Sequence, residues 1–369
     1  MKTAFSLNTI KNDSKASSTL DLLRFLSALV VFLYHFYLPV PGYQAVMVFF
    51  VLSGYFISSS VLKTIKQNRW NWSVYLFNRV TRLWIVLLPC LLLTLMWAKL
   101  QSGIFGNHEI ANHLDIKTFI GNFFFVQDIL VDQYGSNGPL WSLSYEFWYY
   151  ILFPCLILVV YSKKVSMKCL YAFLFVAISF FVGQRIMLYF LIWMLGAMIP
   201  LVKPLILKNK IVKNIILWLS VVVSVVLAKY LYILLHLDHP TYEQTGRQYY
   251  ADFGVGLAFT IMVYLIVSFL NEKKIKRMFN INKYLASFSF TLYLTHYPLL
   301  NIVTTWRNSA YWNFNQIETL LLKPTIILSV LLYAIVIASL TEMHTDTIKK
   351  FIFKKNSVKI TNESVTKAS

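Results

Sequence analysis

Arg24 and His35 are ionisable residues inside the first long apolar run of the sequence. Eleven helical steps of about 100° return to within about 20° of the start, so both side chains would project from one helix face. They would be about 16 Å apart along the helix axis. Each residue has a structural explanation as well: Arg24 as an anchor at a membrane surface, His35 as a partner of a neighbouring helix. Their shared face favours a catalytic pair, with His35 as a candidate general base.

Another apolar run opens with the segment Gly138-Pro139-Leu140-Trp141-Ser142-Leu143-Ser144-Tyr145-Glu146. Glu146 is expected about 10 Å below the outer membrane surface, near the depth of His35. A carboxylate at that depth is costly, so we expect a catalytic Glu146 that orients His35 or binds a polar substrate. A structural carboxyl satisfied by Ser or Trp donors is the alternative. Ser142 and Trp141 are candidates for substrate binding, by hydrogen bonding and by stacking.

Two further sites combine charge with helical spacing. Arg79 and Arg82 share a helix face, and guanidinium groups so placed can bind phosphate oxygens; plain topological charge is the alternative. His296 precedes Pro298, which removes a helical hydrogen bond and predicts a kinked, polar site. Substrate binding and a packing role are both open for His296. Backbone groups freed at Gly54 or Pro298 are candidates to stabilise an oxyanion.

The composition indicates that lipid is the solvent for the elements that carry these residues. Apolar residues make up 58% of the 369, and charged residues only 13%, whereas soluble domains carry about 25%. The 34 Lys and Arg against 15 Asp and Glu lie between apolar runs, which indicates membrane loops rather than nucleic-acid binding. Three cysteines, an odd number, predict neither a disulfide framework nor a metal centre.

Ten apolar stretches are long enough to cross a bilayer. They are 20–38, 44–62, 82–100, 139–161, 167–183, 186–202, 211–230, 252–270, 284–304 and 322–341. The first is read as a retained helix rather than a signal peptide, and the least defined boundary is Gly183-Gln184-Arg185. With the N-terminus in the cytoplasm, most Lys and Arg fall on the cytoplasmic side, as the positive-inside rule requires.

The expected fold is therefore an all-α integral membrane protein of about ten transmembrane helices with both termini in the cytoplasm. Residues 1–19 form a cytoplasmic segment, 20–341 the transmembrane domain, and 342–369 a cytoplasmic tail. The outer loops, above all 101–138, are rich in Tyr, Phe, Asn, His and Asp and are places where a polar ligand could bind.

Five motifs in order resemble the acyltransferase-3 family of membrane-bound O-acyltransferases. They are Arg24-x10-His35, the run from Phe49 to Tyr55, Arg79-x-x-Arg82 with Pro89, the run from Leu140 to Glu146, and the run from Ser289 to Pro298. Together they cover residues 20–300. The sequence departs from the family at Phe147, where a second acidic residue is common, and at Gln44-Ala45-Val46-Met47, which replaces the commoner acidic lead-in.

The resemblance implies a transmembrane acyltransferase in a plasma membrane, the inner membrane of a bacterium. It implies an acyl-CoA donor, by default acetyl-CoA, and a carbohydrate acceptor of exopolysaccharide, capsule or O-antigen type, or its lipid-linked precursor. Membrane lipid is then the other partner, with no metal and no nucleic acid; the sequence leaves the oligomeric state open.

In this interpretation the CoA phosphates bind Arg79 and Arg82 together with Arg24. His35 acts as general base or forms an acyl-histidine, and Trp141, Ser142 and His296 bind the acceptor. A transporter or flippase for a lipid-linked glycan is the rival class, because it would also place charges within the membrane. Sparse Gly and Pro, twelve and ten residues, and the lack of an inverted repeat favour the enzyme.

Overall fold

The chain folds almost entirely into helices, as its apolar runs predict. The computed structural model describes residues 7–106, 113–135, 137–238, 246–272, 281–307 and 317–351, and these contain no β-strand. The helices are α1 (Lys15–His35), α2 (Gly42–Lys66), α3 (Trp72–Phe105), α4 (Ile116–Phe123), η2 (Gly138–Leu140), α5 (Trp141–Tyr161), α6 (Val165–Met198), η3 (Ile199–Leu201), α7 (Lys210–Asp238), α8 (Gly246–Leu270), α9 (Ile281–Ala286), α10 (Ser289–Arg307), α11 (Ile317–Leu340) and η4 (Glu342–His344).

Eight helices in the described part of the chain are long and apolar enough to cross a membrane. They confirm an all-α, multi-pass membrane fold, while the count of ten spans and the orientation stay predictions. The start of α3 differs from the predicted span for a clear physical reason. α3 begins at Trp72, ten residues before the predicted start, because Asn71 caps it by accepting a hydrogen bond from the Val74 amide. Residues 352–369 of the predicted tail lie outside the described residues.

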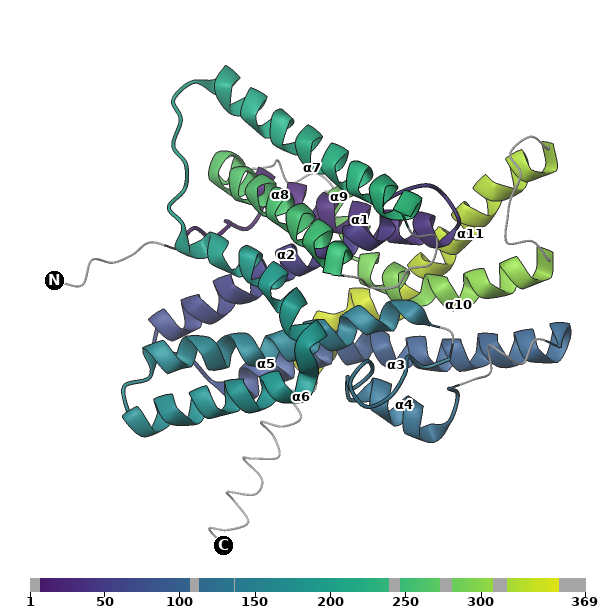
Figure 1. Ribbon diagram of the computed structural model, residues 1–369, viewed down its shortest axis with the longest axis horizontal. Helices are drawn as coiled ribbons and strands as arrows, with labels where there is room; N and C mark the ends of the chain where they lie inside the picture. The colour runs from purple at the N-terminus through teal and green to yellow at the C-terminus, as the bar shows by residue number, and fades with distance from the viewer. Residues whose placement is uncertain are drawn as a thin grey trace, which may run out of the picture.

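The two spans predicted at 167–183 and 186–202 form one element, α6, with a break at Gly183. Gly183 has φ 82° and ψ 172°, a backbone conformation that strongly favours glycine. The two halves of α6 therefore run in different directions without a connecting loop (Figure 1). Buried residues gather in the second half, which packs into the core, while the first half is mostly exposed to the surroundings.

α10 is not among the eight apolar helices, although it contains most of the predicted span 284–304. It packs against α1, α3 and α11. A helix covered by protein on several sides can carry polar residues at membrane depth, because its polar groups find partners in the neighbouring helices. This explains how α10 accommodates His296 and several threonines.

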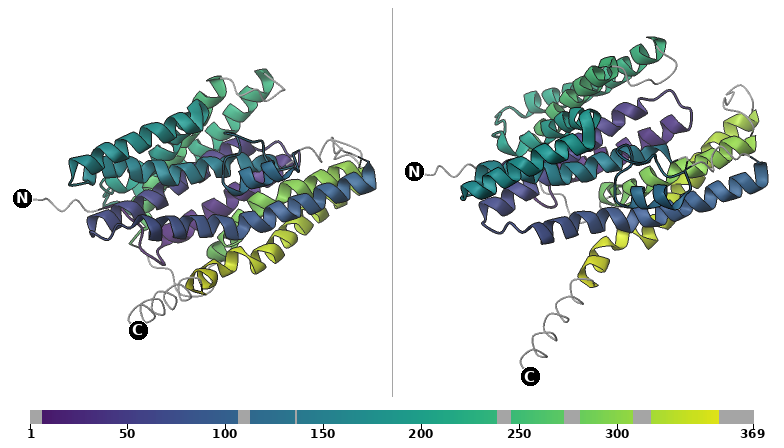
Figure 2. Two further views of the ribbon diagram at one scale, coloured as in Figure 1. Left: turned by 90° about the horizontal axis from the view of Figure 1, so that it is seen from below. Right: turned by 60° about the horizontal axis from the view of Figure 1, so that its bottom comes forward.

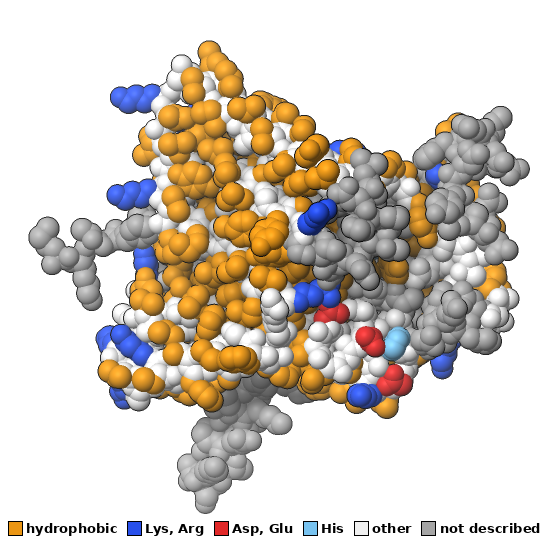
Figure 3. Space-filling view, viewed as in Figure 1, with side chains coloured by type: hydrophobic (Ala, Val, Ile, Leu, Met, Phe, Trp, Pro, Cys, Tyr) orange, Lys and Arg blue, Asp and Glu red, His pale blue; other side chains and the backbone are white. Residues whose placement is uncertain are grey.

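The helices form a layered bundle around α1 and α2. Figure 2 shows α7 and α8 together on one side of the molecule and α3 with α10 and α11 on the other. Hydrophobic side chains cover much of the face in Figure 3, as expected for contact with lipid. Several Lys and Arg side chains stand along its left edge, beside the segment between α6 and α7 and, lower down, where α2 ends and α6 begins in Figure 1.

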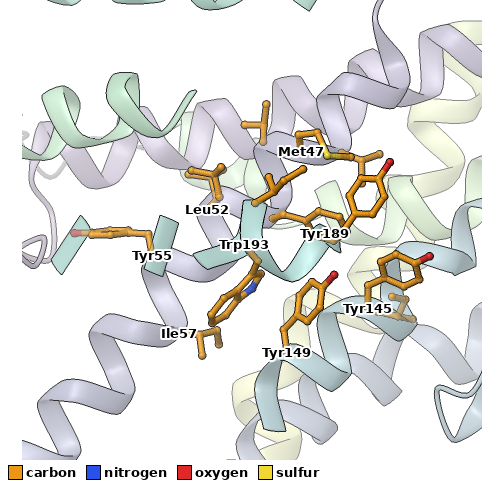
Figure 4. Packing of buried hydrophobic residues seen from close by; sticks show 14 of the residues in the cluster. Met47, Leu52, Tyr55, Ile57, Tyr145, Tyr149, Tyr189 and Trp193 are labelled. Carbon is orange, nitrogen blue, oxygen red and sulfur yellow. The ribbon is translucent and has the colours of Figure 1, made fainter. Parts of the chain in front are cut away.

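The centre of the bundle is the crossing of α2 and α6. A Cβ atom on Gly54 would lie 2.1 Å from the Trp193 carbonyl oxygen, and one on Gly196 would lie 2.0 Å from that of Val51. Both glycines therefore allow the two backbones to touch, and Gly54 serves packing rather than oxyanion binding. Trp193 is fully buried beside them, among aromatic residues of α5 and α6 (Figure 4).

Candidate active site

His35 is the last residue of α1, and its imidazole meets that of His296 in α10. Nδ1 of His35 lies 2.9 Å from Nε2 of His296, and the two rings stack with their centroids 5.1 Å apart. The residues are 261 positions apart in the sequence. Packing of α1 against α10 brings them together.

The hydrogen bonds of His296 determine which nitrogen of each neutral ring carries the proton. Nδ1 of His296 lies 2.9 Å from the carbonyl oxygen of Leu292. A carbonyl can only accept, so this Nδ1 donates, and Nε2 of the same ring must accept. Nδ1 of His35 is then the donor between the rings, which leaves its Nε2 with a lone pair. A nitrogen in that state can act as a general base.

The histidine cavity, of about 380 Å³, is named for His35, which lines it. Trp141 also lines it, and Tyr43 lies flat against the Trp141 ring, with centroids 5.5 Å apart and planes 13° apart. His296 is fully buried and is not one of the described side chains that face this cavity. The structure therefore places His296 behind His35, where it can position the imidazole, rather than in the predicted contact with substrate.

The arginine cavity, of about 70 Å³, is lined by Arg24, Arg79 and Arg82. These residues come from α1 and α3, so helix packing has gathered the three guanidinium groups that the sequence assigned to phosphate. Arg79 donates to the Ser60 hydroxyl at 3.2 Å, and Arg24 lies 3.6 Å from an Asp21 oxygen. Both arginines are thus held in place while still lining the cavity.

Glu146 lines the arginine cavity, not the histidine cavity. It accepts hydrogen bonds from the Ser53 hydroxyl at 2.8 Å and the Tyr150 hydroxyl at 2.5 Å. The expectation that Glu146 orients His35 is therefore corrected, since His296 occupies that position. Depth along α5 was a poor guide because the direction of the side chain depends on which helix packs against it.

A middle cavity of about 40 Å³ lies between the other two. It shares Val46 and Tyr293 with the histidine cavity, and Phe49, Glu146 and Phe290 with the arginine cavity. Ser142 lines it, and its hydroxyl lies 2.7 Å from the Tyr293 hydroxyl. Three neighbouring cavities therefore lie in a row between Arg24 and His35. Ser142 lines the middle cavity and is not among the described residues that line the histidine cavity.

The backbone group freed by Pro298 is an acceptor. Pro298 lacks an N–H, so the carbonyl of Leu294, four residues earlier, has no partner within its helix. The Asn137 side-chain amide donates to this carbonyl at 2.9 Å, and the Cys90 thiol lies 3.0 Å from it. A carbonyl cannot stabilise an oxyanion, so the predicted role for this backbone is wrong, and the kink instead ties α10 to α3 and to the segment before η2.

Several polar residues of the histidine cavity were not singled out from the sequence, among them Tyr43, Asp128 and Arg185. The Tyr43 hydroxyl lies 3.2 Å from that of Tyr189, which donates to buried Asp252 at 2.8 Å. The useful sequence signal was the polar composition of the loop 101–138, which carries Asp128. Arg185 had been noted only as part of the boundary Gly183-Gln184-Arg185.

The described part of the chain thus combines a histidine pair, an arginine cluster and a row of cavities inside a helical membrane bundle. The family described as Acyltransferase domain matches residues 18–343 of the chain. The chain therefore belongs to the acyltransferase-3 family, as its motifs had indicated, and is a multi-pass membrane protein with an acyltransferase domain.

Two curated proteins are similar to parts of this chain. An uncharacterized protein of Haemophilus influenzae is 25% identical over 143 residues, which are 37% of this chain and 56% of that protein. The peptidoglycan O-acetyltransferase OatA of Listeria monocytogenes is 29% identical over 164 residues, 41% of this chain and 26% of that protein. The match thus spans about half of one relative and a quarter of the other. No solved structure matches the chain.

Proposed function

We propose that this protein transfers an acyl group, by default acetyl, from acyl-CoA to a hydroxyl group of a cell-surface glycan or its lipid-linked precursor. The observation that carries the proposal is the row of cavities between the three arginines and His35. The similar protein of Listeria monocytogenes, named as a peptidoglycan O-acetyltransferase, supports the class of reaction. A bacterial inner membrane is the location that suits such a substrate.

The proposed donor would extend along this row of cavities. CoA carries phosphates at one end, a long narrow pantetheine arm, and the thioester at the other end. Arg24, Arg79 and Arg82 can pair with the phosphate oxygens. The middle cavity is narrow and mostly apolar, which suits the arm. About 16 Å of α1 separates Arg24 from His35, so the thioester would arrive near the imidazole.

His35 would act on the acceptor hydroxyl. Its Nε2 takes the hydroxyl proton while the oxygen attacks the thioester carbonyl, and the carbon–sulfur bond then breaks. The protonated imidazole returns that proton to the departing thiolate, so an ester and free CoA are formed. His296 would assist as an acceptor for Nδ1–H of His35, which keeps Nε2 as the base throughout, as the carboxylate of a catalytic triad does. Attack by Nε2 itself, through an acyl-histidine, is the alternative route to the same products.

Glu146 and the other carboxylates near the arginines would tune the donor site. Asp21, Glu146 and Glu342 all interact electrostatically with Arg24. Glu342 is itself held by the Thr291 amide and hydroxyl at 2.9 and 2.8 Å. This arrangement would keep the empty cavity from carrying three uncompensated positive charges.

The direct test uses purified protein in lipid nanodiscs with acetyl-CoA labelled in the acetyl group. We expect free CoA to be released when envelope glycan from the same cells is added, and the label to appear in the glycan. Movement of a lipid-linked glycan across vesicles without CoA release would instead identify the protein as a flippase and reject the enzyme.

A further inference from the structure

Asp128 and Arg185 form an ion pair on the wall of the histidine cavity. Nη1 of Arg185 lies 3.5 Å from Oδ2 of Asp128, and both residues line the cavity that contains His35. The Asp128 side chain is 13% exposed and that of Arg185 is 44% exposed. A ligand in the cavity can therefore reach the pair, which is not a fully buried structural ion pair.

Both partners are held by the surrounding fold. Asp128 lies in a tight turn, where its amide donates to the Val131 carbonyl at 3.0 Å. Its carboxylate also accepts from the Tyr145 hydroxyl at 3.3 Å and from the Gln133 amide. Arg185 follows the helix break at Gly183, and its guanidinium stands 6.0 Å over the Trp141 ring. The geometry of the pair is thus set before any ligand binds.

The charge on this cavity wall cancels. Among the described residues that line the histidine cavity, Arg185 is the one Lys or Arg, and Asp128 the one Asp or Glu. A sugar hydroxyl can donate to Asp128 and accept from Arg185 at the same time, so it gains from the pair without breaking it. Several aromatic rings of the same wall suit the apolar faces of a sugar.

A carboxylate or phosphate on the acceptor would meet a different environment. It could approach Arg185 only on the cavity wall that also carries Asp128, so its negative charge would stand close to that carboxylate. Like charges at close range in a partly buried site are unfavourable. The Tyr145 and Gln133 contacts keep Asp128 from turning away.

We propose that the sugar residue acylated by this protein is uncharged and rich in hydroxyls, and that Asp128 is the residue that rejects acidic sugars. The inference rests on the proposed acyl transfer and adds the class of acceptor. An arginine on a cavity wall by itself would favour acidic sugars; its pairing with Asp128 reverses that preference.

The first experiment identifies the labelled residue. The purified chain is given labelled acetyl-CoA and envelope glycan from its own cells, and the product is cleaved to single sugars for mass spectrometry. We expect the label on an uncharged sugar. Label on a uronic acid or a phosphorylated sugar would overturn the inference and leave the proposed transfer intact. An absence of both CoA release and label would reject the proposed function itself.

The second experiment tests Asp128 with a matched pair of inhibitors, methyl α-glucuronide and its methyl ester, which differ in one charge. For the wild type, we expect the ester to inhibit transfer at a concentration at least about tenfold lower than the free acid. Asp128→Asn should narrow this ratio to about twofold, because the amide keeps the shape and removes the charge.

Asp132→Asn is the matched control. Asp132 is also in this loop, but it pairs with His113, is 71% exposed and does not line the cavity, so its variant should keep the wild-type ratio. Binding of acetyl-CoA checks that each variant is folded. An unchanged ratio in Asp128→Asn, or equal narrowing in the control, would contradict the role of Asp128. If Asp128→Asn does not fold, the sugar identified with the wild type still decides the inference.

Discussion

His296 stands behind His35 with its Nε2 atom 2.9 Å from His35 Nδ1, and its own Nδ1 is bonded to the Leu292 carbonyl. This relationship assigns different tasks to two residues of the same type. In the proposed mechanism, His35 uses Nε2 as the general base, and His296 fixes the tautomer of His35 that leaves Nε2 unprotonated. The two histidines should therefore respond differently to the same substitutions.

For His35, both Ala and Gln should abolish transfer. General-base catalysis supplies about 10²–10⁴-fold in rate, and a Gln amide cannot take up a proton at neutral pH. Binding of acetyl-CoA should stay close to the wild type, because the proposed phosphate site, the arginine cavity, is at the other end of the row. The measurement is the amount of acylated glycan per unit of folded protein. Substantial activity in His35→Gln would rule out His35 as the general base.

For His296, Gln should be better tolerated than Ala. Its side-chain oxygen can accept the hydrogen bond from His35, whereas Ala leaves that donor without a partner. We expect His296→Ala to lower kcat by about 10²-fold, to leave KM for acetyl-CoA unchanged and to alter the pH profile, with partial recovery in His296→Gln. Equal activity in the wild type and His296→Ala would exclude the positioning role.

Arg79→Ala and Arg82→Ala should weaken acetyl-CoA binding. Lys should restore it only in part, because an ammonium lacks the planar fork that pairs with two phosphate oxygens. Lys63→Ala is a suitable control, since Lys63 is an exposed cation in the last turn of α2 that does not line the arginine cavity. Binding measured by calorimetry in nanodiscs distinguishes the two groups. Similar losses in all three variants would point to general charge rather than a site.

Gly54→Ala and Gly196→Ala should destabilise the protein, because each new Cβ would collide with a backbone carbonyl of the crossing helix. Overpacking of this kind costs about 1–3 kcal/mol. Gly103→Ala in α3 is the matched control, since nothing lies within 4 Å of its added Cβ, and helix propensity favours Ala there. Thermal unfolding in detergent should show a lower Tm for the first two variants only.

Reporter fusions test the predicted orientation. Fusions after residues 164 and 277 should report the cytoplasm and a fusion near residue 120 the outside, because Lys and Arg alternate between the two sides in that arrangement. A cytoplasmic signal near residue 120 would contradict the ten-span arrangement.

Sequence alone was sufficient for the membrane class, most helix positions and several of the residues that line the cavities. Length and hydropathy determine whether a segment can span a bilayer, and these are properties of the segment itself. Ionisable residues in apolar runs are costly, so Arg24, His35, Glu146 and His296 could be recognised without knowing their partners. The five ordered motifs were enough to identify the family, which the match over residues 18–343 confirmed.

Only the tertiary structure decided which of these residues meet. The contact between His35 and His296 joins residues that are 261 positions apart in the sequence. Glu146 accepts hydrogen bonds from Ser53 and Tyr150 rather than contacting His35. Asp128 and Arg185, unremarkable in the sequence, became a pair on the cavity wall. Partners of this kind depend on how helices cross and rotate against one another. The crossing and rotation of helices are determined by packing at many positions distant in the sequence, such as the contact of Gly54 with Gly196's helix. A local pattern of residues therefore does not determine them.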